Sequence, residues 1–315
     1  MKKQNILVTG ANGQIGSDLI PELKKIYGDS HVIATDISEK PNAETPFEVL
    51  DVLDAKAINS VFKKYQITQV YHLASLLSAK SELNPRHAWN VNINGLFNIM
   101  DNCVENKISK LFWPSSIAVF GPNSPKIDTP QFTTMDPDTV YGISKLAGER
   151  WCHHYHFSKS LDVRSLRYPG VISYKHEPGG GTTDYAVDIY FKAVQEGRYE
   201  CYLTEDTILP MMYIPDAIKA TIQLMESPSH SLGLRSGYNI AGMSFAPEDL
   251  AKEILNYIPD FKVIYRPDFR QRLADTWPES VNDQFAKADW NWQPEYDIKS
   301  MTEDMIKNVR MLTPV

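Results

Sequence analysis

The sequence predicts an α/β protein in which a doubly wound parallel sheet forms the larger part and a smaller α/β cap the rest. Two observations support this class. Short, nearly continuous apolar runs alternate with longer amphipathic stretches through the first half of the 315 residues, as expected for parallel strands covered by helices on both faces. A glycine-rich turn follows the first apolar run directly and opens a helical stretch. Because crossovers between parallel strands are right-handed, a doubly wound sheet is the leading topology.

Apolar periodicity defines the expected elements in chain order. Leu19, Leu23 and Ile26 recur at helical spacing, whereas residues 5–9 form a short apolar run typical of a buried strand. The expected strands are 5–9, 31–35, 69–73, 110–114, 162–167 and 238–240. The expected helices are 15–27, 55–65, 89–106, 141–158, 185–196, 216–225, 247–257 and about 299–309. Segment 207–214 is mostly apolar.

Composition excludes several classes of partner. Apolar residues make up 43% of the chain, which is enough for a well-buried core, and the formal net charge is −7 with both signs scattered. An acidic chain without a basic stripe is a poor binder of nucleic acid, and no stretch approaches the roughly 20 apolar residues that span a bilayer. We therefore expect neither a nucleic-acid partner nor a membrane contact.

Cysteine use and the first residues predict a cytoplasmic location. Cys103, Cys152 and Cys201 are far apart and odd in number, so a disulfide framework is not expected. Residues 1–10 enter a strand pattern without the apolar core of a secretory signal. Both observations fit a protein of a reducing compartment.

Gly10, Gly13 and Gly16 form a turn between a strand and a helix that suits a dinucleotide. Gly10 permits the tight turn, Gly13 lets the backbone approach a pyrophosphate, and Gly16 lets the helix pack close to the strand. The helix N-terminus offers free N–H groups and a partial positive charge to the phosphates. The sequence therefore predicts a dinucleotide-binding Rossmann domain over 1–171 with late elements from about 207–241. A substrate-binding lobe is expected over 172–206 and 242–315.

The position of Asp36 favours NAD over NADP. This residue lies 20 positions after Gly16, at the end of the second expected strand. A carboxylate there accepts from both ribose hydroxyls and repels a 2′-phosphate, whereas the alternative role is a turn cap. The other residues expected along this part of the cofactor are Gln14, Ile15, Ile37, Asp51 and Val52.

Tyr141 and Lys145 stand four residues apart and so share one face of the expected helix. A neighbouring ammonium and a bound nicotinamide cation both favour the phenolate of Tyr141 over the phenol, which lets it act as a general base near neutral pH. Ser116 stands 25 residues upstream of Tyr141, at the end of a strand, where its hydroxyl can hold the substrate oxygen. These three residues are the candidate catalytic set.

Four segments, residues 10–16, 72–75, 116–121 and 141–145, resemble the extended short-chain dehydrogenase/reductase superfamily, and the resemblance covers nearly the whole chain. It implies that Ser116, Tyr141 and Lys145 carry the chemistry. It also implies a homodimer formed through helices 89–106 and 141–158. The further cofactor contacts that we expect from it are Leu73, Ala74, Ser75, Asn92, Tyr168 and Val171, besides Tyr141 and Lys145 themselves.

The second half distinguishes between the reactions of this superfamily. Segments 168–172, 178–185, 209–216 and 275–278 resemble the short-chain L-threonine dehydrogenases, a branch of it. That resemblance implies oxidation of the 3-hydroxyl of L-threonine by NAD+ to 2-amino-3-ketobutyrate and NADH, in threonine catabolism toward glycine. The substrate contacts expected from it are Ser78, Ser116, Tyr141, Gly180, Thr182, Thr183 and Trp277.

The residues themselves also favour a small substrate. Between positions 170 and 213 the lysines and arginines are Lys175, Lys192 and Arg198, a small set for holding a diphosphate. The loop 177–184 offers backbone N–H groups and hydroxyls that suit the carboxylate of a small zwitterion, and its glycines suit a closing lid. The alternatives are an NDP-sugar 4-epimerase or dehydratase of the same superfamily and an NAD-binding module without turnover, against which the intact triad argues.

No metal site is expected. His153, His154 and His156 stand together late in helix 141–158, but a metal site needs convergent ligands and usually a carboxylate or cysteine partner. We interpret them as surface residues.

Overall fold

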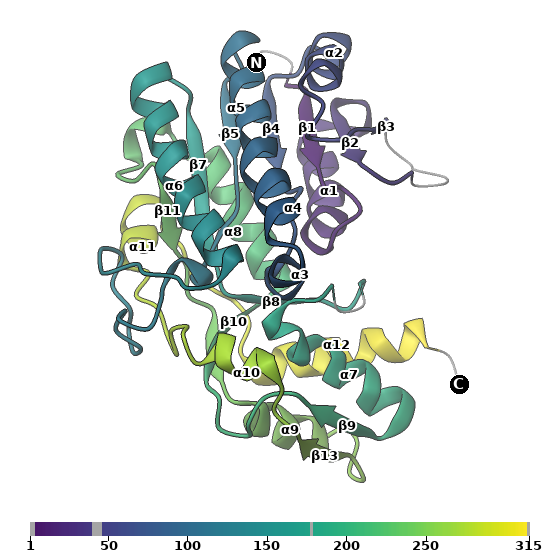
Figure 1. Cartoon of the computed structure of the whole chain (residues 1–315). Coiled ribbons are helices and arrows are strands. Elements are labelled where there is room, and N and C mark those ends of the chain that lie inside the picture. The colour runs from purple at the N-terminus through teal and green to yellow at the C-terminus, as the bar shows by residue number, and fades with distance from the viewer. Residues whose placement is uncertain (1–3, 40–45, 177–178, 314–315) are drawn as a thin grey trace.

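A parallel sheet of eight strands forms the centre of the larger lobe, in the upper part of Figure 1. The computed structural model describes residues 4–39, 46–176 and 179–313. The strands follow the order β11-β7-β5-β4-β1-β2-β3, with β6 beside β7, and every pair is parallel. They are β1 (Ile6–Thr9), β2 (Val32–Asp36), β3 (Phe47–Val49), β4 (Gln69–His72), β5 (Lys110–Phe112), β6 (Ser115–Ser116), β7 (Val163–Tyr168) and β11 (Gly237–Asn239).

Strand order reverses between β1 and β4, which fixes where a ligand binds. Ile6 of β1 pairs with Val32 of β2 on one side and with Gln69 of β4 on the other. In doubly wound sheets the crevice at the carboxyl ends of such strands is the ligand site. The predicted fold class is therefore confirmed, and its switch point lies directly at the glycine turn that follows β1.

Helices cover both faces of this sheet. Leu19 and Leu23 of α1 enter the core on one face beside α8, while Ile58 of α2, Ile99 of α5 and Cys152 of α6 enter a second core on the other. Helical spacing of these apolar residues is what buries one side of each helix. The helices of this lobe are α1 (Gln14–Tyr27), α2 (Ala55–Tyr65), α3 (Ser78–Leu83), α4 (Pro85–Trp89), α5 (Gly95–Glu105), α6 (Val140–Lys159), α8 (Ile214–Glu226) and α11 (Gln284–Trp290).

The single helix expected over 89–106 is wrong in its start and its continuity. Asn84 caps a helix that begins at Pro85, because its side-chain oxygen accepts from the N–H of His87 and proline suits a first helical position. A π-helical turn, η2 (Asn90–Asn94), then separates α4 from α5. Such turns are frequent at functional sites, and this one carries the buried Asn92.

The smaller lobe holds two small sheets and a group of packed helices, shown in the lower part of Figure 1. Its helices α7, α9 and α12 contact one another, and its apolar core is continuous with the α1–α8 side of the larger lobe. The elements are β8 (Gly170–Ile172), β9 (Arg198–Cys201), β10 (Leu209–Tyr213), β12 (Met243–Phe245), β13 (Lys262–Tyr265), α7 (Tyr185–Glu196), α9 (Pro247–Leu255), α10 (Phe269–Ala274) and α12 (Ile298–Leu312).

The elements from about 207–241, which were expected to belong to the larger lobe, are distributed over both lobes. Helix α8 and strand β11 pack there, whereas β10 pairs with β8 and β12 in a three-stranded sheet. The exact division into domains stays a prediction. Among the described residues, no helix is both long and apolar enough to cross a bilayer.

A buried ion pair joins α6 to β7 beneath the carboxyl ends of the strands. The guanidinium of Arg167 donates to both carboxylate oxygens of Glu149 at 2.8 Å, and the hydroxyl of Ser115 donates to the same carboxylate at 2.6 Å. Both charged side chains are at most 2% exposed. Removing one partner of such a pair leaves the other charge buried without compensation.

We expect Glu149→Ala to lower the free energy of unfolding by about 3–5 kcal/mol, the range for breaking a buried pair. The matched control is Glu196→Ala, which removes an exposed carboxylate paired with Lys192 and is expected to change the free energy of unfolding far less, because exposed ion pairs contribute little. Urea unfolding of both variants measures the difference. Equal effects of the two substitutions would contradict a structural role for the buried pair.

Candidate active site

Ser116, Tyr141 and Lys145, the candidate catalytic set, line one pocket. The hydroxyl of Thr139 accepts from the N–H of Gly142 and so starts α6 just before Tyr141. A Cβ on Gly142 would lie 2.2 Å from the carbonyl oxygen of Ala118, so only glycine lets α6 begin this close to the segment after Ser116. The Lys145 amine lies 5.3 Å from the centre of the Tyr141 ring.

Burial shifts the pKa values of both α6 residues. It raises the pKa of Tyr141 to about 12, although a hydrogen bond with Ser116 acts in the opposite direction. It lowers the pKa of Lys145 to about 7, and the amine donates to the carbonyl oxygen of Pro114 at 2.8 Å. Without a cofactor, burial therefore keeps Tyr141 as the phenol near neutral pH. The equilibrium between the phenol and the phenolate of Tyr141 then depends on the positive charge that a bound cofactor brings.

The buried amine of Lys145 predicts a pH-dependent change in stability. Its pKa is 10.5 in an ordinary environment and about 7 here, so between these values the unfolded chain binds a proton that the folded protein does not. Wild-type stability therefore rises with pH in this window. Without cofactor, Lys145→Met is expected to exceed wild type in free energy of unfolding near pH 7. This difference should shrink as the pH rises toward 10. Urea unfolding across the range measures this; a difference that does not vary with pH would contradict it.

The glycine turn closes as tightly as the spacing predicts. Gly10 has a φ of +68°, and a Cβ there would lie 2.7 Å from the backbone nitrogen of Ala74. A Cβ on Gly16 would lie 2.6 Å from the carbonyl oxygen of Gly10, so Gly16 serves helix–strand packing. No side chain caps the start of α1 after Gly13, which leaves its first N–H groups for an anion.

The expected residues of the adenosine half lie around one pocket. The carboxylate of Asp36 accepts from the N–H of Asn12 at 3.0 Å and from that of Ser38 at 3.2 Å, which fixes it at the end of β2. Both of its oxygens keep lone pairs for ribose hydroxyls. The predicted residues that line this pocket are Gly10, Gly13, Asp36, Ile37, Asp51, Val52, Leu73, Ala74 and Ser75.

The two pockets share Leu73 and Ser75, so one cleft runs from Asp36 to Tyr141. The side-chain amide of Gln14 donates to the carbonyl oxygen of Val171 at 3.0 Å and joins α1 to β8 at the floor of the cleft. Gln14, Ile15, Tyr168 and Val171, all predicted cofactor contacts, line its Tyr141 end. The glycine turn at the end of β1 and the carboxylate of Asp36 fit a dinucleotide with its phosphates at the glycine turn.

Asn92, predicted as a cofactor contact, lines neither pocket. Its side-chain oxygen accepts from the N–H of Leu76 at 2.8 Å and from the hydroxyl of Ser75, and its amide donates to the carbonyl oxygen of Leu76. Asn92 therefore positions the backbone beside the cofactor cleft.

The predicted substrate residues divide into two groups. Ser78, Thr183 and Trp277 line the catalytic pocket, together with Ser116 and Tyr141, whereas Gly180 and Thr182 do not. The hydroxyl of Ser78 accepts from the N–H of Thr182 at 3.1 Å, which ties α3 to the glycine loop. Residues 177 and 178 of that loop lie outside the described residues.

The backbone N–H groups expected to hold a substrate carboxylate already have partners. Those of Gly180 and Gly181 donate to one carboxylate oxygen of Asp184, at 2.8 and 2.7 Å, and that of Thr182 donates to Ser78. The loop forms a capping turn on its own carboxylate, so these three N–H groups are already engaged and do not point to a carboxylate of the substrate.

Sequence reasoning missed Asp184, which lines the catalytic pocket. It is the only Asp or Glu among the described residues that line it, and Lys145 is the only Lys or Arg. The available signal was a single carboxylate within a string of glycines and threonines. Other lining residues that were missed are Leu77, Pro114, Ser115, Ile117, Pro169, Gly170 and Gly181.

Comparison with known families settles the membership of this chain. The model of the NAD-dependent epimerase/dehydratase family matches residues 6–241. The protein belongs to this family. A Staphylococcus haemolyticus relative described as an uncharacterized epimerase/dehydratase is 45% identical over 311 residues, which are 97% of this chain and 98% of the relative.

Solved structures of similar proteins extend over the same length. A GalE-like L-threonine dehydrogenase from Cupriavidus necator, in its holo form, is 50% identical with a TM-score of 0.95 and covers 97% of this chain and 99% of its own. A monomeric L-threonine 3-dehydrogenase from a metagenome is also 50% identical, with a TM-score of 0.96 and coverages of 98% and 99%. The protein is an NAD-dependent oxidoreductase of the extended short-chain dehydrogenase/reductase type, and NAD is its cofactor.

Proposed function

We propose that this enzyme oxidises the 3-hydroxyl of L-threonine with NAD+ and releases 2-amino-3-ketobutyrate and NADH. The observation that carries the proposal is the carboxylate of Asp184 in the same pocket as Tyr141. An α-ammonium group needs an anionic acceptor when it leaves water, since an unpaired charge is costly to bury. The names of the similar solved structures support the same substrate.

The polar groups of this pocket suit a zwitterion better than a nucleoside diphosphate. Asp184 can accept from the ammonium, while Thr183 and Trp277 offer a hydroxyl and an indole N–H. The indole nitrogen of Trp277 is buried and has no hydrogen-bond partner among the described residues. Arg and Lys side chains commonly hold phosphate groups, and only Lys145 is present among the described residues that line this pocket.

The residues of the pocket handle the proton transfer, while the hydride is left to the cofactor. When bound, NAD+ supplies the acceptor for the hydride that leaves C3. Tyr141 is placed to take the proton of the 3-hydroxyl, and Ser116 to donate a hydrogen bond to that oxygen as it becomes a ketone. Lys145 stays near Tyr141, where its charged form favours loss of the phenolic proton.

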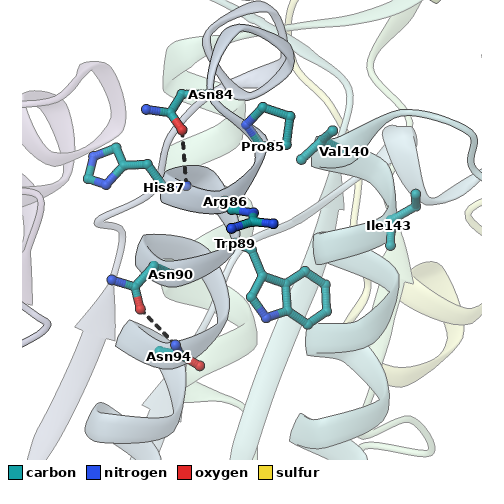
Figure 2. A pocket seen from close by; sticks show the side chains of 9 residues that line it. All are labelled: Asn84, Pro85, Arg86, His87, Trp89, Asn90, Asn94, Val140 and Ile143. Atoms are coloured by element: carbon teal, nitrogen blue, oxygen red, sulfur yellow. Dashed lines mark hydrogen bonds between the residues drawn. The ribbon is translucent and has the colours of Figure 1, made fainter.

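We further propose a cytoplasmic homodimer. The three cysteines are buried free thiols, which fits a reducing compartment. The faces of α4, η2 and α6 expose Trp89 and Ile143, each more than 40% accessible, around a pocket where Trp89 lies between the helices (Figure 2). Light scattering tests the assembly: a dimer should have twice the 35.8 kDa chain mass, and the chain mass itself would contradict it.

One assay separates the proposed reaction from sugar-nucleotide epimerisation or dehydration. The purified protein is incubated with NAD+ and L-threonine, and in parallel with UDP-glucose or UDP-galactose, while NADH absorbance is followed. We expect net NADH with threonine alone. Sugar interconversion without net NADH would support the epimerase alternative and overturn the proposal.

A further inference from the structure

Another cavity, of about 400 Å3, lies beside α6, on the side of this helix that is turned away from α5. Arg150, His153 and Phe157 of α6 form one wall, and the segments 131–135 and 233–236 form the others. Edge contact with Phe97 of α5 places Trp151 on the opposite side of α6. The cavity shares no lining residue with the NAD cleft or with the pocket around Trp89. Its lining residues come from α6, from β7, from segment 131–135 and from the segment before β11, and α6, β7 and β11 lie together in Figure 1.

Basic residue types gather around this cavity although the chain is acidic overall. Its described lining includes Arg150, Arg167, Arg235 and His153 and no Asp or Glu. Desolvation lowers the pKa of His153, and the charges of Arg150 and His156 act in the same direction.

The carboxylates nearest to these cations are already engaged. Glu149 is paired with Arg167, and Asp162 accepts from Arg164 at 2.8 Å and from Arg235 at 2.6 Å. Asp289 accepts from the N–H of Gly233 at 2.8 Å and from the hydroxyl of Tyr238. Arg150, in contrast, has no ion-pair or hydrogen-bond partner within the described parts of the chain, so its guanidinium is available to a ligand.

Flat rings stand beside these donors. The rings of His153 and Phe157 lie 4.6 Å apart, and Phe132 packs edge-on against Phe285 at 5.3 Å. Phe132 and Phe157, both lining the cavity, are each 67% exposed. A ligand with an aromatic ring would bury this apolar surface, while its anionic group would meet the guanidinium groups.

We propose that this cavity binds a small aromatic anion, a flat ring that carries a phosphate or carboxylate group. Arg150 supplies the uncompensated charge, Arg235 and His153 supply further N–H donors, and Phe132 and Phe157 contact the ring. The site goes beyond the proposed threonine oxidation and shares no lining residue with its pocket.

Calorimetric titration with 4-nitrophenyl phosphate tests the site. NAD-saturated protein is used, so that the cofactor cleft is closed to the probe. We expect saturable binding to one site, and a loss of affinity by roughly 10- to 100-fold in Arg150→Ala, as removal of a hydrogen bond to a charged group implies. Lys307→Ala, which removes an exposed cation from α12 in the other lobe, is the matched control and should bind like wild type. Inorganic phosphate should bind more weakly than the ester, because it lacks the ring.

Three results would overturn the inference. If the ester shows no saturable binding to wild type, the proposed site does not exist. If wild type and Arg150→Ala, both folded by circular dichroism, bind the ester with equal affinity, Arg150 does not contact the ligand. Inorganic phosphate binding as tightly as the ester would exclude a role for the aromatic side chains.

Discussion

Replacing Tyr141 by phenylalanine is expected to lower the rate of threonine-dependent NADH formation by roughly a hundredfold to ten-thousandfold, the range for a lost general base. Tyr141 lines the catalytic pocket within 5.3 Å of the Lys145 amine, measured to its ring centre. The substitution removes only the oxygen that takes the proton. NAD affinity should change little, because the ring stays in place.

Tyr155→Phe is the control for that substitution. Tyr155 lies on the same helix, and its hydroxyl donates to Asp101 at 2.6 Å, away from the catalytic pocket. Steady-state kinetics of both variants should show a large loss in kcat for Tyr141→Phe alone. Turnover of Tyr141→Phe within a few-fold of wild type would show that another group takes the proton.

Asp184→Asn is expected to lower kcat/KM for L-threonine by roughly a hundredfold, since loss of one partner of a buried charge pair costs about 2–5 kcal/mol. Asparagine keeps an oxygen that can accept from Gly180 or Gly181, so the loop can retain its turn. Asp188→Asn, one turn further along in α7, removes the same charge outside the pocket and should behave like wild type.

A substrate analogue distinguishes lost recognition from a disturbed loop. With 3-hydroxybutyrate, which lacks the ammonium, wild type should perform poorly and Asp184→Asn should lose no further activity. If the variant loses the same factor with both compounds, Asp184 acts through loop structure and not through the ammonium.

The cofactor half of the site could be predicted because its chemistry is encoded locally. A pyrophosphate against a strand–helix turn requires Gly10, Gly13 and Gly16 at fixed spacing, and the ribose requires a carboxylate at the end of the next strand. The proton-transfer pair lies within one helical turn. Helical and strand periodicity likewise predicted the central sheet and most of the helices around it.

Features that depend on distant contacts could not be predicted. The apolar run around Leu209–Tyr213 shows no periodicity that says which sheet it joins, and it pairs with β8 and β12. The partners of Gly180 and Gly181 follow from the turn that their loop adopts around Asp184. The pKa of Tyr141 depends on how deeply the side chain is buried, and the spacing of Tyr141 and Lys145 in the sequence does not show this.

The most direct test of the account is transfer of deuterium from L-threonine labelled at C3 to the nicotinamide ring. The purified protein, NAD+ and the labelled amino acid are combined, and the NADH formed is analysed by mass spectrometry. The account predicts one deuterium in each NADH and a slower reaction than with unlabelled threonine. NADH without deuterium, or no NADH at all from a folded, NAD-binding protein, would contradict it.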